Sequence, residues 1–275
     1  MRDIPGSICA ERRWLRRRLI RFVGNVVVSS LLLLSSIAAH AAPADAKARI
    51  AFVGDSLAQN YWAGVFRLVA TDPCLKSNLD LGRFARPASG LANSVYFNWL
   101  REIRRIDDTY KPTVTVISIG LNDRQGILDP KGIPILWGAP NWADKYRQQV
   151  TEFLDGAVAT KAIVLFVGLP VMRDGYFNTD MAAKNVMYAE AVARLGAPNL
   201  RYLEPWKLNV SGPETYSVHA PDRTGRPVQI RHSDGVHFTN GGDDLLALYL
   251  LPKIIAALAD AGVVVDLCLR TQIAQ

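Results

Sequence analysis

The sequence has few of the side chains that bind metal ions in proteins. Its 275 residues include three cysteines and four histidines, and none of them is spaced like the ligands of a zinc site. The sequence therefore predicts no metal and no other cofactor. A metal phosphoesterase built on carboxylates and one histidine stays open as an alternative, although it is short of histidine ligands. Its ligands would be Asp55, Asp123, Asp234 and His237.

The sequence also lacks internal repeats, low-complexity tracts and a recognisable linker. Its first part is different: six arginines within residues 12–21 precede an apolar run with serines over 26–39, and Ala39-His40-Ala41 reads as a cleavage site. These features predict a signal peptide over residues 1–41 and a single domain over residues 42–275. A transmembrane anchor is the alternative, but the run is short for a full span. The arginines also resemble a twin-arginine export signal, with the ordinary secretory route as the default.

The chain beyond the leader has no large excess of one charge. Seven of the 32 basic residues and two of the 25 acidic residues lie in residues 1–41, so 25 basic and 23 acidic residues remain. A partnership with nucleic acid therefore loses its main support. The expected location is the periplasm or the outside of the cell, with membrane contact only through an uncleaved leader.

Two cysteines remain once the leader is removed. In an oxidising compartment Cys74 and Cys268 can pair, which would join the segment after the first helix to the C-terminal tail. Two buried free thiols are the alternative.

Short apolar runs alternate with helical stretches, which is typical of a parallel sheet with crossover helices. We expect a hairpin over 215–231 and a last helix kinked at Pro252. The expected strands are 49–53, 79–84 (weak), 113–119, 162–167 and 200–203, and the expected helices are 58–70, 95–109, 143–158, 179–195 and 245–261.

Polar motifs follow several of these strands, at the sheet edge where ligands collect in such folds. Residues 54–57 (Gly-Asp-Ser-Leu) place Ser56 at the start of a helix, where backbone N–H groups are unpaired. A serine there can act as a nucleophile, with its own amide directed at developing negative charge. Taken alone, a helix cap formed by Asp55 or Ser56 is the simpler interpretation.

Residues 120–123 (Gly-Leu-Asn-Asp) follow a buried strand. The side-chain amide of Asn122 can donate to an oxyanion, and Gly120 lets a substrate approach. An Asx-turn is the simpler alternative. We expect Asp123 to hold the loop rather than act as an acid.

Residues 234–237 (Asp-Gly-Val-His) precede the last helix. The spacing brings the carboxylate of Asp234 near the imidazole of His237, which would fix the histidine tautomer. A cluster at a helix start is again the alternative. His219 and His232 are rival bases, but neither has an aspartate in this position.

These motifs, in this order, resemble the blocks of the SGNH (GDSL) hydrolase family, over nearly the whole chain after the leader. Residues 231–239 (Arg-His-Ser-Asp-Gly-Val-His-Phe-Thr) resemble an exported bacterial branch of that family and the SGNH domains of envelope polysaccharide acetylation proteins. The resemblance implies a flavodoxin-like three-layer α/β/α sandwich with a five-stranded, mostly parallel sheet.

The resemblance also implies a role for each motif residue. It makes Ser56 the nucleophile, His237 the base and Asp234 the residue that orients the base. The implied oxyanion donors are the Ser56 amide, a glycine amide and the Asn122 side chain. We take Gly90 as that glycine, with Gly82 as the alternative.

The loop over 124–142 is apolar and rich in proline, so it either lines the site or packs on the domain surface. Arg124 and Arg173 lie near the same edge, where each meets a substrate anion or a local carboxylate.

The leading hypothesis is a serine esterase that hydrolyses acyl esters, in particular O-acetyl esters, of cell-envelope carbohydrate through an acyl-enzyme. Its substrate would be a small-molecule or glycan ester. The alternatives are an O-acyltransferase acting on envelope polysaccharide, a lipid or thioester hydrolase, and a non-catalytic glycan-binding protein.

Overall fold

The computed structural model describes residues 47–129, 131–204 and 215–268. The predicted signal peptide over 1–41 lies outside these residues. Within the described ranges, no helix combines the length and hydropathy that a membrane span needs.

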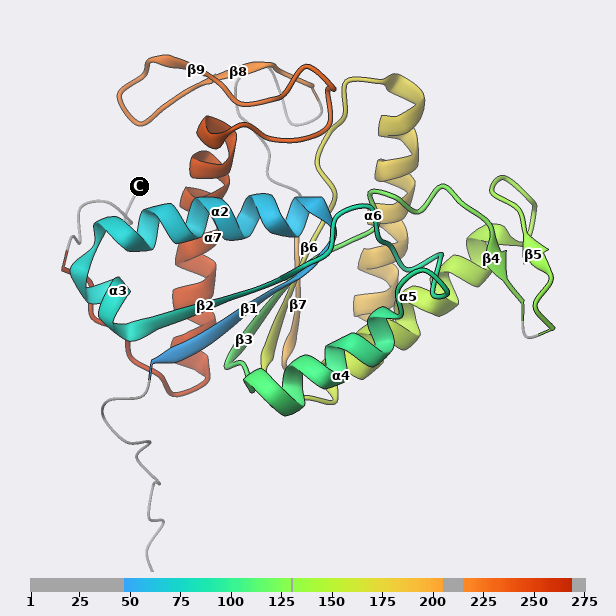
Figure 1. The fold of residues 1–275 in the computed structure, drawn as a ribbon, viewed down its shortest axis with the longest axis horizontal. Coiled ribbons are helices and arrows are strands. Elements are labelled where there is room, and N and C mark those ends of the chain that lie inside the picture. The colour runs from blue at the N-terminus through green and yellow to red at the C-terminus, as the bar shows by residue number, and fades with distance from the viewer. Residues whose placement is uncertain (1–46, 130, 205–214, 269–275) are drawn as a thin grey trace, which may run out of the picture. The chain divides into compact units, whose positions relative to one another are not determined.

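Five parallel strands form the central sheet, in the order β2-β1-β3-β6-β7 (Figure 1). The strands are β1 (Ala48–Gly54), β2 (Leu79–Ala85), β3 (Val114–Ser118), β6 (Ile163–Val167) and β7 (Leu200–Leu203). Chain order reverses at β1, so β1 and β3 are neighbours and their carboxyl ends form the edge where ligands bind in this architecture. The five-stranded α/β fold predicted from the sequence is confirmed, and every strand pair in the sheet is parallel.

Helices cover both faces of this sheet. α2 and α7 pack together on one face, and α4, α5 and α6 lie on the other (Figure 1). The long helices are α2 (Ser56–Thr71), α4 (Trp99–Tyr110), α5 (Trp142–Val158), α6 (Gly175–Leu195) and α7 (Asn240–Asp260).

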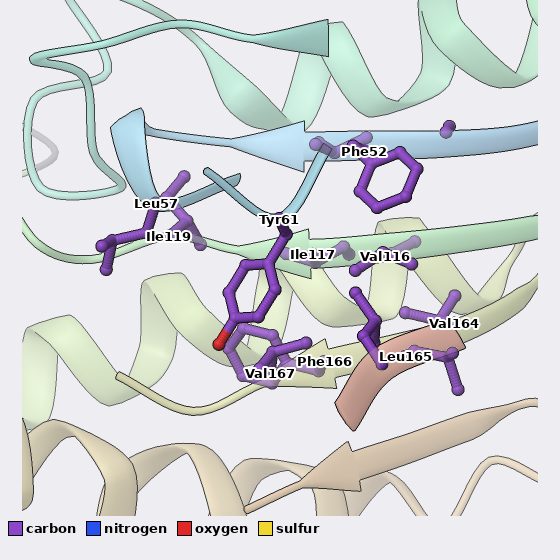
Figure 2. Packing of buried hydrophobic residues seen from close by; sticks show 14 of the residues in the cluster. Phe52, Leu57, Tyr61, Val116, Ile117, Ile119, Val164, Leu165, Phe166 and Val167 are labelled. Carbon is purple, nitrogen blue, oxygen red and sulfur yellow. The ribbon is translucent and has the colours of Figure 1, made fainter. Parts of the chain in front are cut away.

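The core lies between the sheet and these two helical layers. Side chains of β1, β3 and β6 meet Leu57 and Tyr61 of α2 there, as Figure 2 shows. The central strands β3 and β6 are buried at every position, and apart from the buried Thr115 and Ser118 of β3 their residues are apolar. The motif over 120–123 therefore follows a strand that is fully buried.

Several helices begin at other residues than the hydrophobic pattern predicts, because polar side chains cap them. α4 starts at Trp99 rather than at residue 95, since Asn98 accepts from the Arg101 N–H. The last helix starts at Asn240 rather than at residue 245, with Thr239 as its cap. α2 and α6 also start earlier than predicted, after the capping residues Asp55 and Asp174.

Two small elements were not predicted. A short helix, α3 (Pro73–Asn78), follows α2, and the loop over 124–142 contains a small hairpin of β4 (Ile127–Leu128) and β5 (Pro134–Ile135). The hairpin predicted over 215–231 is confirmed as the antiparallel strands β8 (His219–Pro221) and β9 (Pro227–Gln229).

A disulfide joins Cys74 to Cys268, as the first of the two cysteine hypotheses predicts. Their Cα atoms are 5.4 Å apart, and 194 positions separate them in the sequence. The bridge ties α3 to the tail that follows α7.

We expect the loss of this bridge to lower stability. Cys74→Ser should reduce the free energy of unfolding by roughly 2 to 4 kcal/mol, because the unfolded chain regains the freedom that the cross-link removes. Urea unfolding of protein without residues 1–41 would measure it, with Ser77→Ala in the same helix as the control. Thiol titration of denatured wild-type protein without residues 1–41 should find no free thiol before reduction and two afterwards. Two thiols before reduction would contradict the bridge.

Candidate active site

The first and last motifs meet at the carboxyl edge of the sheet. Ser56 is the first residue of α2, directly after β1, and its Oγ lies 2.8 Å from Nε2 of His237. The two residues are 181 positions apart. This is the hydrogen bond through which an imidazole can take the proton of a serine hydroxyl.

The carboxylate of Asp234 holds the other ring nitrogen of His237. Asp234 Oδ2 lies 2.7 Å from Nδ1, while Oδ1 accepts from the backbone N–H groups of Val236 and His237. Burial alone would raise the pKa of Asp234, but the hydrogen bonds from His237 and Val236 outweigh it and lower the pKa to about 2. The carboxylate is therefore ionised at neutral pH and favours a proton on Nδ1, which leaves Nε2 free to accept from Ser56.

The rival histidines lie elsewhere in the same region. His219 is in β8, and the backbone N–H of His232 donates to the His237 carbonyl. Among the described residues, His237 is the histidine that contacts Ser56.

Two of the predicted oxyanion donors lie on loops that contact each other, and the third is the N–H of Ser56 itself. The Nδ2 of Asn122 donates to the carbonyl of Ser89 at 2.8 Å, so Asn122 and Gly90 lie next to each other. The Ser56 N–H is in the first turn of α2, where no helical acceptor exists. Gly82, the alternative to Gly90, lies in the middle of β2, where a Cβ would meet the rings of Phe84 and Tyr110.

Gly90 must be a glycine because the carboxylate of Asp123 lies against it. A Cβ at Gly90 would come within 2.0 Å of Asp123 Oδ1. That carboxylate accepts from the N–H groups of Leu91 and Ala92 and from the hydroxyl of Tyr146. Asp123 is fully buried, and the hydrogen bonds to its carboxylate oxygens hold two loops together, as predicted.

Asp55 joins the start of α2 to the loop after β3 by hydrogen bonds to its carboxylate. One oxygen accepts from Leu57 N–H, and the other accepts from the N–H groups of Gly120 and Leu121. Burial raises the pKa of Asp55 to about 7, although these three hydrogen bonds act against the shift. The cap expected at this helix start therefore exists, and the same residue also places the loop of Asn122.

Arg124 is engaged within the protein. Its Nε lies 2.8 Å from Oδ2 of Asp180, and its guanidinium lies over the rings of Trp137 and Phe177. Of the two expectations for Arg124, the structure shows the ion pair with a local carboxylate.

Arg173 lies against the motif that carries Asp234 and His237. The backbone N–H of Arg173 donates to the Gly235 carbonyl. Its side chain covers Gly235, where a Cβ would come within 2.7 Å of Arg173 Nε. Gly235 has a φ of +74°, so glycine suits both the backbone and the contact. Arg173 is exposed and forms no ion pair with a described residue, so its charge is available beside the site.

Sequence reasoning missed three residues that position His237. Arg231 is buried, donates to the carbonyls of Val236 and Val171, and lies 3.8 Å over the Phe238 ring. Nothing in its sequence position signals this role, because the partner carbonyls are identified only by the fold.

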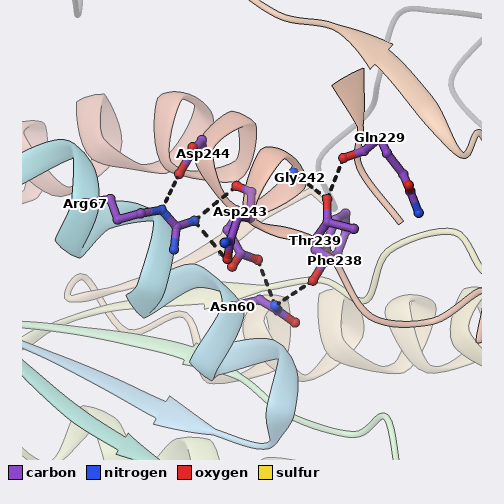
Figure 3. A network of polar contacts seen from close by, with 9 residues as sticks. Asn60, Arg67, Gln229, Phe238, Thr239, Gly242, Asp243 and Asp244 are labelled. Carbon is purple, nitrogen blue, oxygen red and sulfur yellow. Dashed lines mark hydrogen bonds and ion pairs between the residues drawn. The ribbon is translucent and has the colours of Figure 1, made fainter. Parts of the chain in front are cut away.

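The other two are Asn60 and Asp243, which link α2 to α7 (Figure 3). Asn60 Nδ2 donates to Asp243 Oδ1 at 2.7 Å and to the Phe238 carbonyl at 3.2 Å. Asn60 is one helical turn after Ser56, and Phe238 follows His237. This pair of bonds therefore fixes the distance between serine and histidine.

Some apolar side chains of the loop over 124–142 pack against the domain, and others are exposed. Ile127 and Trp142 are buried in the core, while Leu128, Ile133 and Leu136 are exposed.

The four ligands of the metal phosphoesterase alternative do not form a metal-binding cluster in the structure. Among the described residues, three possible metal-binding side chains come close together only at Asp72, Cys74 and Cys268, and both cysteines are in the disulfide.

A family model described as a protein of unknown function (DUF459) matches residues 49–253. No curated protein matches the sequence. Solved structures do match: the psychrotrophic esterase EstA from a Pseudoalteromonas species has a TM-score of 0.51 at 16% identity, covering 77% of this chain and 98% of its own. A carbohydrate esterase family 3 structure from Talaromyces cellulolyticus has a TM-score of 0.51 at 15% identity, covering 78% and 99%.

A third structure, of an acetyl esterase mutant with acetate ion, also has a TM-score of 0.51, at 14% identity and with 78% and 99% covered. At these identities the likeness concerns the fold alone. The resemblance to SGNH hydrolases that the motifs predict is confirmed at that level.

The carboxyl group of Asp243 predicts a pH dependence of stability. Burial raises its pKa to about 7, so from about pH 4 to 7 the folded protein keeps a proton that the unfolded chain has lost. Stability therefore falls as pH rises, by roughly 1 kcal/mol per pH unit from this group. We expect Asp243→Asn, which keeps the oxygen that accepts from Asn60, to have a flatter slope than wild type in urea unfolding at pH 5, 6 and 7.

The matched control is Asp108→Asn, which removes an exposed carboxylate from α4, on the other face of the sheet, and should keep the wild-type slope. Parallel slopes for wild type and Asp243→Asn would contradict the prediction.

Proposed function

The chain belongs to the family described as a protein of unknown function (DUF459), and we propose that it is a serine esterase that removes O-acetyl groups from cell-envelope carbohydrate. The observation that carries the proposal is the continuous hydrogen-bonded chain from Ser56 through His237 to Asp234, with contacts of 2.8 and 2.7 Å. A helix cap or an Asx-turn would explain each motif alone, but neither requires the three side chains to meet.

In the proposed reaction, Ser56 Oγ attacks the ester carbonyl while Nε2 of His237 takes the hydroxyl proton. Asp234 stabilises the imidazolium that forms. His237 then gives the proton to the departing sugar oxygen, which leaves an acetyl group on Ser56. Water attacks this acyl-enzyme with His237 as the base, and acetate is released.

The negative charge that develops on the carbonyl oxygen would be met by the Ser56 N–H, the Gly90 N–H and the second N–H of Asn122. The first N–H of Asn122 is held by the Ser89 carbonyl, which fixes the direction of the second. Asp55 and Asp123 keep the two loops in place from beneath.

Hydrolysis fits the site better than acyl transfer because the catalytic side chains are open to water. The side chain of His237 is 38% exposed and that of Asp234 is 47% exposed. Closure of a site against water protects an acyl-enzyme from hydrolysis, and the exposed side chains of this site lack that protection. An open site suits a small acyl group on a large, polar carrier.

The carbohydrate part of the proposal rests on the predicted export signal and on Arg173. An exported esterase meets envelope polymers, and the exposed guanidinium of Arg173 beside the site suits a glycan that carries carboxylates. Two structures with the same fold are named as a carbohydrate esterase and an acetyl esterase, which agrees with this substrate class.

We expect Ser56→Ala to remove turnover of p-nitrophenyl acetate, with kcat at least about 10⁴-fold below wild type. Asp234→Asn should lower kcat by a similar factor, because the amide stabilises the wrong histidine tautomer. Stopped assays with circular dichroism spectra of each variant would measure both. The control is Ser233→Ala, an exposed neighbour of Asp234. Wild-type turnover by Ser56→Ala would end the proposal, and activity lost on chelation would instead favour the metal phosphoesterase.

The substrate can be identified by acetate release from acetylated polysaccharides and acetylated peptidoglycan. We expect wild type to release acetate from a carboxylate-bearing acetylated glycan faster than from its neutral counterpart, and Arg173→Gln to narrow that difference. Addition of an unacetylated acceptor sugar should leave acetate release unchanged. Acetyl transfer to the acceptor in place of acetate release would identify the protein as a transferase.

A further inference from the structure

Lys184 is a buried cation behind the loop that carries Asn122. It lies in α6, its residue is 1% exposed, and its Nζ donates to the Gly120 carbonyl at 2.9 Å. The ammonium also lies 5.5 and 5.8 Å from the ring centroids of Trp137 and Tyr146. A buried ammonium costs free energy unless nearby charges compensate for it, so its presence in this place calls for a physical reason.

The Gly120–Leu121 peptide group is held from both sides. On one side its carbonyl accepts from Lys184, and on the other its N–H donates to Asp55 Oδ2 at 2.9 Å. A peptide between a cation at its oxygen and an acceptor at its nitrogen is polarised, and both hydrogen bonds gain strength in a buried environment. Asn122 is the next residue along the chain.

We propose that Lys184 is a positioning residue for the oxyanion site: its positive charge holds the loop of Gly120 and Asn122 where the oxyanion will form. The inference rests on the proposed function, since it concerns the transition state of the esterase reaction. The charge also offsets the two buried carboxylates, Asp55 and Asp123, that hold the same loops. Without it, the site would keep its hydrogen-bond donors but lose the compensation that makes their arrangement stable.

The ionisable groups around Lys184 set the pH range of this effect. Burial lowers the pKa of Lys184 to about 8, while the carboxylates of Asp123, Asp180 and Asp55 act in the opposite direction. Arg124 lowers the pKa further. The hydroxyls of Tyr146 and Tyr188 complete the surroundings and hydrogen-bond each other at 2.9 Å. The ammonium is thus charged at pH 7 and neutral well above pH 8.

The test compares Lys184→Gln with wild type. Glutamine retains an N–H donor for the Gly120 carbonyl but carries no charge. We expect kcat for p-nitrophenyl acetate at pH 7 to fall by about 10-fold or more while KM stays near the wild-type value, as for an interaction made only in the transition state. The control is Lys253→Gln in α7, where the lysine also donates to a backbone carbonyl and lies over a tyrosine ring.

The pH profile separates charge from mere packing. Wild-type kcat should decline between pH 7 and 9 as Lys184 loses its proton, whereas Lys184→Gln should lack that decline. The two profiles should converge at the alkaline end, where the wild type has lost the same charge. Wild-type kcat in Lys184→Gln at pH 7, or the same alkaline decline in both proteins, would overturn the proposal.

A readout without turnover distinguishes failure of this inference from failure of the proposed function. The backbone amide resonance of Leu121 reports on the Gly120 carbonyl and also on Asp55, which accepts from the same N–H and whose pKa burial raises to about 7. In wild-type protein it should therefore move in two steps, one near pH 7 and one near pH 8, and Lys184→Gln should abolish the step near pH 8. If the variant does not fold, the wild-type titration alone decides: a Leu121 amide without a step near pH 8 would overturn the role of the charge, whether or not the protein hydrolyses esters.

Discussion

The contact between α2 and α7 is the constraint on which the site depends. The hydroxyl of Ser56 and the imidazole of His237 come from opposite ends of the chain, and neither motif holds the other by itself. The two helices meet along their length, and Asn60 and Asp243 bind them to each other one turn from Ser56 (Figure 3). The geometry of the site is therefore a property of the packing on one face of the sheet.

A second constraint lies on the other side of Ser56. The loops of Gly90 and Asn122 are irregular and would be mobile by themselves, yet their backbone N–H groups end on two buried carboxylates. Burial of a carboxylate destabilises its charged form, and the raised pKa of Asp55 reflects this effect. The fold is therefore less stable than it would be without the buried carboxylates, but the hydrogen-bond donors are fixed in place, as electrostatic preorganisation requires.

Much of this was available from the sequence. The alternation of β-branched runs with amphipathic stretches predicts the five strands, because both central strands are buried on two faces and consist mainly of apolar residues. The motif residues Ser56, Asn122, Asp234 and His237 could be named because each follows a strand or precedes a helix. The resemblance to SGNH hydrolases then assigned each of them a role.

The remainder was not available, for physical reasons. Helix starts moved because a single capping side chain, such as Asn98 or Thr239, outweighs the hydrophobic period at an end. Lys184, Arg231 and Asp243 are charged residues within ordinary helical or loop sequence, and only the fold reveals that each is buried against a specific carbonyl or amide. The ion-pair partner of Arg124 could not be predicted either, since Asp180 lies on a helix 56 positions further along the chain.

The bridge between Cys74 and Cys268 encloses most of the chain, including Asn122, Asp234 and His237, in one covalent ring. A protease that cuts a single exposed peptide bond inside the ring, for example in the turn between β8 and β9, leaves both fragments attached to each other. The nicked molecule keeps its serine and its histidine within one covalent unit. In the exported esterase proposed above, such a cut would not separate the two halves of the site.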